Sequence, residues 1–211
     1  MHFHIVTLFP DSFSSYFSAS ILKRAIVDKK IKISFYNPID FLKDKERVDD
    51  RPYGGGPGMV MRAEPVAKAI QKAVGKKTDY KIIFFTPSGE KFTNSKAKEY
   101  VETTKNIIFV SGRYEGIDAR VLEIFPCEKV SIGEYVLTGG ELPAMIMIDA
   151  ISRNIKGVLG DLDSVEENRI SSPLVYTRPE SLKFKTKTYK VPDVLLSGHH
   201  KEIDKWRSEQ G

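Results

Sequence analysis

The chain of 211 residues has one cysteine and four histidines. A single thiol, Cys127, excludes an intrachain disulfide and any zinc or iron–sulfur site built from several cysteines. His2 and His4 lie far in sequence from His199 and His200, and none has the His-x-x-x-His spacing of a helical metal site. We therefore expect no metal site.

Long apolar runs are also lacking. The N-terminus has no basic segment followed by an apolar stretch, and no later segment is long enough to cross a bilayer. Together with the scarcity of cysteine, this predicts a soluble, cytoplasmic protein. Lys and Arg number 33 against 28 Asp and Glu, a formal charge of +5. This modest basic excess favours an acidic partner such as nucleic acid.

Short runs of β-branched and aromatic residues alternate with helix-like segments in the first three quarters of the chain. The expected strands cover residues 4–9, 31–36, 81–85, 107–110 and 129–132, and the expected helices cover 12–27, 64–74, 95–103, 117–124 and 140–153. This alternation predicts an α/β domain with a mostly parallel sheet covered by helices.

The pattern changes after residue 154. Residues 160–170 are polar without apolar periodicity, which indicates a linker or loop. Residues 177–211 hold a few extended residues and one short helix, expected over 199–207, which is too little for a sizeable core of its own.

Residues 51–59 contain four glycines. That density suits either a loop in which backbone amides approach a ligand or a tight structural turn, and glycine content does not separate the two. The segment lacks the Lys-Ser/Thr ending of a Walker A loop and the Gly-x-Gly-x-x-Gly spacing of a dinucleotide turn. A nucleotide-dependent phosphotransferase is therefore a poorly supported alternative.

Three more glycine-bearing loops, 86–89, 111–116 and 132–140, each follow an expected strand. In open α/β sheets, ligands bind at the carboxyl ends of the strands, so these loops are expected to build one cleft. Ordinary strand-to-helix punctuation explains any one of them alone.

A lysine-rich stretch covers residues 182–190. On one extended chain, Lys183, Lys185 and Lys187 share a face, which suits contact with a phosphate backbone. The alternative is an edge strand whose lysines prevent aggregation. A second basic cluster, within residues 43–51, leads into the glycine-rich segment and makes nucleic acid more plausible.

Seven motifs, in order, resemble the TrmD family of tRNA (guanine-N1)-methyltransferases of the SPOUT class. They are Leu8-Phe-Pro, Asp50-Arg-Pro-Tyr-Gly-Gly-Gly-Pro-Gly-Met, Gly112-Arg-Tyr-Glu-Gly-Ile-Asp, Ser131-Ile-Gly-Glu-Tyr-Val-Leu-Thr-Gly-Gly-Glu-Leu-Pro, Gly157-Val-Leu-Gly, Tyr176-Thr-Arg-Pro and Val194-Leu-Leu-Ser-Gly. The resemblance covers nearly the whole chain.

The resemblance implies a SPOUT-type α/β domain with a deep trefoil knot, and a small, shortened, helical C-terminal domain. The implied domains are a knotted domain that binds S-adenosylmethionine (1–158), a flexible linker (159–175) and a short tRNA-binding domain (176–211). It also implies a homodimer with the active site at the subunit contact.

The resemblance also assigns residues. Those implied to bind S-adenosylmethionine are Thr86, Pro87, Gly112, Tyr114, Glu115, Ile132, Gly133, Glu134, Tyr135, Val136, Leu137, Gly139, Gly140 and Pro143. Those expected to bind the tRNA substrate are Tyr53, Gly54, Gly55, Gly56, Pro57, Gly58, Met59, Lys183, Lys185 and Lys187.

The implied reaction is methylation of N1 of the guanine 3′ of the anticodon, tRNA position 37. Guanine N1 carries a proton at neutral pH, so the reaction needs a base at N1 and a cation or donor at O6. By resemblance, Arg153 serves O6. Asn168 stands where the family has its aspartate base, and an amide cannot accept the proton. Either Glu167 or Glu166 substitutes, or the chain is a non-catalytic homologue that binds S-adenosylmethionine and tRNA. The resemblance leaves open whether Mg2+ assists.

Overall fold

The computed structural model describes residues 1–159 and 174–210. The chain divides into two compact units, Met1–Leu159 and Gly160–Gly211. Most of the expected linker, with Asn168 and Glu167, lies outside the described residues.

A parallel five-stranded sheet, in the order β2-β1-β6-β5-β7, forms the centre of the first unit. Its strands are β1 (His2–Val6), β2 (Lys32–Tyr36), β5 (Lys81–Lys91), β6 (Asn106–Val110) and β7 (Cys127–Ser131). The predicted α/β class with a mostly parallel sheet is confirmed. β5 is longer than expected, because its pairing with β7 resumes after a register shift in which Phe85 and Glu90 both pair with Val130.

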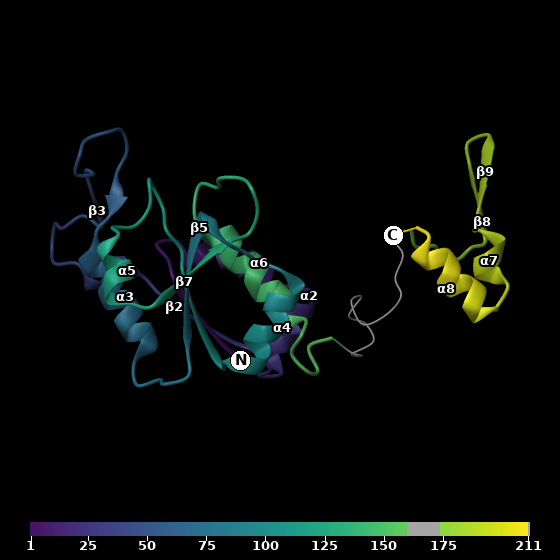
Figure 1. Cartoon of the computed structure of the whole chain (residues 1–211), viewed down its shortest axis with the longest axis horizontal. Helices are drawn as coiled ribbons and strands as arrows, with labels where there is room; N and C mark the ends of the chain where they lie inside the picture. The colour runs from purple at the N-terminus through teal and green to yellow at the C-terminus, as the bar shows by residue number, and fades with distance from the viewer. Residues whose placement is uncertain (160–173, 211) are drawn as a thin grey trace. The chain divides into compact units, whose positions relative to one another are not determined.

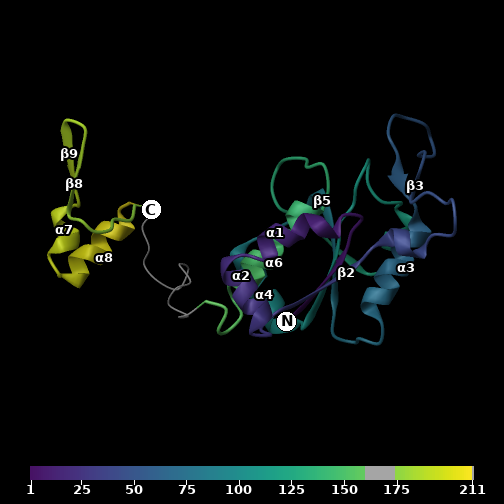
Figure 2. The same ribbon diagram turned by 180° about the vertical axis from the view of Figure 1, so that it is seen from behind.

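Helices cover both faces of this sheet (Figure 1), and the view from behind shows the same layers (Figure 2). On one side lie α2 (Ser20–Val27), α4 (Asn94–Thr103) and α6 (Glu141–Ser152), and on the other lie α3 (Ala63–Val74) and α5 (Arg120–Ile124). The side chains of β1 alternate between the two cores: Phe3 and Ile5 join the cluster of α6, whereas Val6 joins that of α3. Because both faces of the sheet are covered, the residues of β1 from Phe3 to Val6 are all buried.

Two expected helices differ from the structure. The expected helix over 12–27 is broken into η1 (Pro10–Phe13), α1 (Ser14–Phe17) and α2. The expected helix over 117–124 begins only at Arg120, because Ile117 forms a parallel bridge with Met61. In the described part of the first unit, three short elements were not predicted: η2 (Pro38–Phe41) and the antiparallel pair β3 (Asp49–Asp50) and β4 (Val60–Met61).

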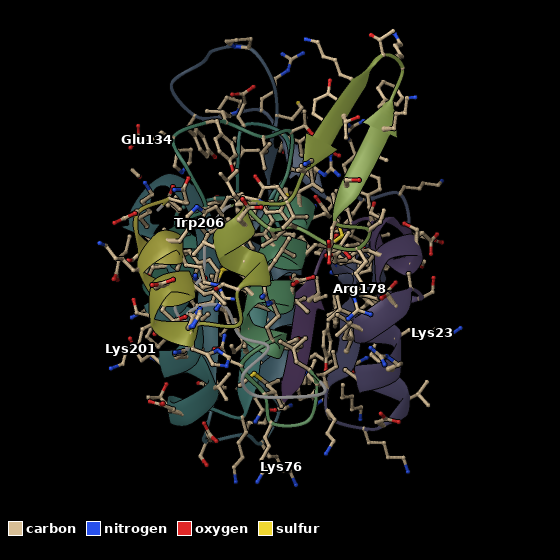
Figure 3. The ribbon with its side chains drawn as sticks, turned by 90° about the vertical axis from the view of Figure 1, so that its right-hand side faces the viewer. Lys23, Lys76, Glu134, Arg178, Lys201 and Trp206 are labelled. Carbon is tan, nitrogen blue, oxygen red and sulfur yellow. The ribbon has the colours of Figure 1, made fainter. Side chains whose placement is uncertain are left out.

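In the second unit, the described residues form the hairpin β8 (Ser181–Phe184) and β9 (Lys187–Lys190), followed by α7 (Asp193–Leu196) and α8 (His200–Ser208). The expected helix over 199–207 is confirmed as α8, and the expected extended residues form the hairpin, whereas α7 was not predicted. Trp206, labelled on α8 in Figure 3, lies with its ring 6.2 Å from that of Tyr176. No helix in residues 1–159 or 174–210 is long and apolar enough to cross a membrane.

The hairpin corrects the expected row of lysines. Lys183 pairs with Thr188, and Phe184 pairs with Lys187, so Lys183 and Lys187 point to opposite faces. The chain reverses between the strands, where Lys185 has a φ of 55°. All three lysines are exposed, but they surround the hairpin instead of sharing one face.

The imidazoles of β1 predict a pH-dependent stability. His4 is fully buried. Its ring is hydrogen-bonded to the hydroxyl of Tyr36 and to the side-chain oxygen of Asn106, and it lies against the ring of His2. Burial lowers the pKa of His4 from 6.5 to about 4. The unfolded chain therefore binds a proton between these values that the folded chain does not, so stability falls as pH decreases from 6.5 towards 4. For His4, we expect a loss of about 2 kcal/mol at pH 5 relative to pH 8.

Urea unfolding at a series of pH values measures this loss. His4→Gln does not titrate there, so its stability should depend less on pH across the same range. An equal slope in the variant and the wild type would contradict the assignment to His4.

Candidate active site

A cavity of about 330 Å³ lies where the segments that follow β5, β6 and β7 meet. Thirteen of the predicted cofactor-binding residues line it, and Glu134 is the exception. Figure 3 shows Glu134 on the outer edge of its loop, and its side chain is exposed. The sequence thus located this cavity from the glycine loops at the carboxyl edge of the sheet, as expected for an open α/β fold.

Some lining residues were not singled out from the sequence: Phe84, Phe85, Arg113, Gly116, Ile117, Val130, Ser131 and Thr138. Arg113 and Thr138 lie inside the same glycine-bearing motifs as the predicted residues. Their position within those motifs was a usable signal. Phe84, Phe85 and Val130 lie within β5 and β7, where sequence does not distinguish a cavity wall from a core.

Two of the cavity loops are locked together by their backbones. The amide of Gly140 donates to the carbonyl of Gly112 at 2.9 Å, and the hydroxyl of Ser111 donates to the carbonyl of Gly140 at 3.1 Å. A Cβ at Gly140 would lie 2.6 Å from the Cα of Ser111. Glycine is therefore required there for the two chain segments to approach so closely.

The glycine-rich segment adjoins this cavity. All four glycines of the segment have positive φ: Gly54, Gly55, Gly56 and Gly58. The segment therefore adopts backbone conformations that other residues rarely take. At the base of the loop, a Cβ on Gly58 would lie 2.6 Å from Cγ of Glu115, and the amide of Glu115 donates to the carbonyl of Met59 at 3.0 Å. The loop thus begins at the cavity wall. The same segment carries Tyr53, which is completely exposed.

A larger cavity, of about 1170 Å³, is lined by β3, β4, α3 and α5 and by Tyr53. It contains none of the predicted cofactor residues. Its polar wall holds ion pairs, including Arg120 Nη2 with Asp118 Oδ2 at 2.6 Å, and this hydrogen bond lowers the pKa of the Asp118 carboxyl. Size alone would select this cavity, but the smaller one has the converging loops, so we take the smaller one as the candidate active site.

Arg153 does not reach the smaller cavity's lining. It is the residue that follows α6, whereas Gly140 and Pro143 place the cavity at the first turn of that helix. A helix of this length is about 18 Å long. Within one chain, Arg153 and the cavity therefore lie at opposite ends of α6.

Residues 1–159 and 174–210 contain no group of three His, Cys, Asp or Glu side chains that could hold a metal ion.

The fold and the pocket define an α/β protein with a cavity at the carboxyl edge of a parallel sheet. The model of the family described as tRNA (Guanine-1)-methyltransferase TrmD matches residues 1–211. The chain belongs to this family.

Relatives named tRNA (guanine-N(1)-)-methyltransferase match nearly the whole chain. That of Pseudoalteromonas atlantica is 46% identical over 216 residues, which cover 99% of this chain and 79% of the relative. That of Buchnera aphidicola is 46% identical, covering 99% and 88%, and that of Clostridioides difficile is 45% identical, covering 100% and 92%.

Proposed function

We propose that this protein methylates N1 of guanine in tRNA, at position 37, with S-adenosylmethionine as the methyl donor. The observation that carries the proposal is the convergence of loops 86–87, 112–117 and 130–140 on one 330 Å³ cavity in a chain that matches the family over its full length. A cavity of this volume falls in the range of small-molecule sites. Its wall joins apolar side chains such as Ile117 and Leu137 to the polar groups of Glu115 and Thr138.

When bound, the donor supplies a methyl group on a sulfonium, which moves to guanine N1 while the N1 proton passes to a base and S-adenosylhomocysteine is released. The residues that line the cavity, Glu115 among them, would hold the donor beside the Gly54–Gly58 loop, because the amide of Glu115 donates to the carbonyl of Met59 at the end of that loop. The guanine is proposed to enter beside that loop. Arg153 is proposed to donate to O6 as charge develops there.

The separation of Arg153 from the cavity supports a site completed by a second subunit. A face of α6 also carries exposed apolar side chains one turn apart, Leu142 (55% exposed) and Ile146 (43%), next to exposed Tyr16. The hydroxyl of Tyr16 donates to Asp149 of α6 at 2.5 Å, so these elements form one surface. We propose that this surface forms a two-fold homodimer, in which each cavity receives Arg153 from the partner.

Ile146→Glu tests the dimer. A charge on this face should convert the dimer into monomers and lower methylation at least tenfold, because each cavity then lacks the arginine. Sedimentation velocity measures the mass, and Lys23→Glu, on α2 and pointing outward in Figure 3, is the control for added charge. A wild-type monomer with full activity would contradict the shared site.

The base is proposed to come from the linker over 159–175. Asn168 and Glu167 both lie outside the described residues, so the proposal for them rests on the sequence. Of the two, only Glu167 has a carboxylate that can accept the N1 proton.

The tRNA is proposed to contact the exposed glycine-rich loop and the lysines that surround the hairpin. Exposed lysines favour contact with the phosphates of a nucleic acid. Residues 176–211 then act as a tRNA-binding domain. Loops 111–118 and 132–140, tied by the Gly112–Gly140 hydrogen bond, are where we propose the trefoil knot closes. For Mg2+, the described residues offer no ligand cluster, and no step is assigned to it.

A methylation assay tests the proposed function. Tritiated methyl groups from S-adenosylmethionine should transfer to a tRNA transcript with guanine 3′ of the anticodon, and not to a transcript with adenine there. Transfer to both, or to neither at high enzyme concentration, would contradict the proposal.

The second candidate is a non-catalytic homologue, and Asn168 at the family's base position is what favours it. Asn168→Asp and Glu167→Gln separate the two. Methylation lost in Glu167→Gln and unchanged in Asn168→Asp would place the base at Glu167. An inactive wild type that gains activity in Asn168→Asp would support the non-catalytic homologue.

A further inference from the structure

The cavity wall rests on a buried ion pair that the proposed chemistry does not use. The carboxylate of Glu141, 3% exposed at the start of α6, has Oε2 at 2.9 Å from Nε of Arg113. Both of these atoms are buried, and neither has a well-aligned hydrogen bond. The contact is therefore a charge pair rather than a directed hydrogen bond. Removing one member of such a pair leaves the other charge buried and uncompensated.

Thr7 holds the other carboxylate oxygen. Its hydroxyl, completely buried, donates to Oε1 of Glu141 at 2.8 Å and accepts from the amide of Phe9 at 3.0 Å. Glu141 is thus fixed from the segment that follows β1. Neither Thr7 nor Glu141 lines the cavity.

Arg113 carries this anchoring to the cavity. Its Nη1 donates to the carbonyl of Thr138 at 3.3 Å, and its guanidinium lies 4.7 Å from the ring centre of Phe9. The chain must pass very close to this ion pair, because a Cβ at Gly139 would lie 2.5 Å from Nε of Arg113 and 2.6 Å from Oε2 of Glu141. Arg113, Thr138 and Gly139 all line the cavity.

We infer that Glu141 and Thr7 are positioning residues for the donor pocket, which act through Arg113 to hold the 138–140 segment in its binding conformation. The inference rests on the proposed function, since it takes the cavity to bind S-adenosylmethionine. Without the carboxylate, Arg113 loses its counter-charge and the loop loses the contact that orders it. Donor binding must then order the loop, and this lowers affinity.

The test measures S-adenosylhomocysteine binding by calorimetry, together with the donor KM, the tRNA KM and the melting temperature. Glu141→Gln keeps the shape but places an amide where Arg113 needs a negative charge, and should raise Kd and the donor KM about tenfold to thirtyfold. Thr7→Val should raise them about threefold to tenfold, whereas Thr7→Ser, which keeps the hydroxyl, should stay within about twofold of wild type. The tRNA KM should change less than the donor KM in every case.

Thr104→Val is the matched control. Thr104 is also buried, and its hydroxyl donates to the carbonyl of Asn106 at the start of β6, away from the cavity. Its loss should lower the melting temperature without changing Kd. If Glu141→Gln does not fold, the comparison of Kd between Thr7→Val and Thr7→Ser tests the inference by itself.

Unchanged Kd in Thr7→Val and in any folded Glu141→Gln overturns the inference. So does a change in Kd that Thr104→Val reproduces, because binding would then follow stability alone. These results leave the proposed function standing when the wild type binds and methylates. A wild type that does not bind S-adenosylhomocysteine overturns both.

Discussion

Arg153→Ala is expected to lower kcat about 100-fold to 1,000-fold, the usual effect of removing one donor from a group on which charge develops. The residue lies at the far end of α6 from its own chain's cavity. The loss should therefore appear in kcat while the affinity for S-adenosylhomocysteine stays within about threefold of wild type, since the donor does not need this arginine to bind. Single-turnover kinetics with saturating donor measures the effect.

Arg153→Lys is the matched variant for this prediction. It keeps the charge and loses the planar fork, so its kcat should fall between the wild type and Arg153→Ala. Equal kcat in the wild type and Arg153→Ala would remove Arg153 from the mechanism. A rise in the donor Kd as large as the fall in kcat would assign it to donor binding instead.

Gly140→Ala is expected to reduce the free energy of unfolding by about 3–5 kcal/mol and to weaken donor binding at least 100-fold. The added Cβ would lie 2.6 Å from the Cα of Ser111 and 3.0 Å from the amide nitrogen of Gly112. Both are backbone atoms of residues that are hydrogen-bonded to Gly140 itself, through the hydroxyl of Ser111 and the carbonyl of Gly112, so neither can move without opening the cavity wall.

The control is Gly112→Ala in the same wall. Its Cβ would meet only the side chain of Ile117, at 3.3 Å, and that side chain can shift. We expect less than about 1 kcal/mol of destabilisation. Thermal and urea unfolding compare the two variants, and a similar loss in both would show that the backbone contact at Gly140 is not the cause.

The sequence located the cavity proposed to bind the donor because glycines mark the ends of three strands, and parallel strands bring those ends to one edge. It could not show the contact of Arg113 with Glu141. That contact joins residues far apart in sequence, and no local pattern records their distance. Arg153 illustrates the same limit: its place after α6 is local, but its distance from the cavity follows from the length and direction of the helix.

The prediction that the lysines of residues 182–190 share one face was wrong for a different reason. Its alternation of lysine with other residues continues unbroken from Lys183 to Lys187, although the chain reverses at Lys185 and Thr186. Two-residue hairpin turns usually contain glycine or asparagine, which tolerate positive φ and so mark the turn in the sequence. Here a lysine adopts it, so the sequence indicates one strand where the structure has two.

The strand order also bears on how the chain reaches its folded state. His2 pairs with Asn106, and Val6 pairs with Val110. The first strand, β1, therefore lies beside β6, which is synthesised about 100 residues later. During synthesis, β1 has β2 on one side but no neighbour on the other until β6 has emerged. Closing so long a loop costs entropy before any contact repays it, and sheets of this kind fold slowly. The apolar side chains of β1 thus stay exposed for a long time in the nascent chain, where they are a site for aggregation or for chaperone binding.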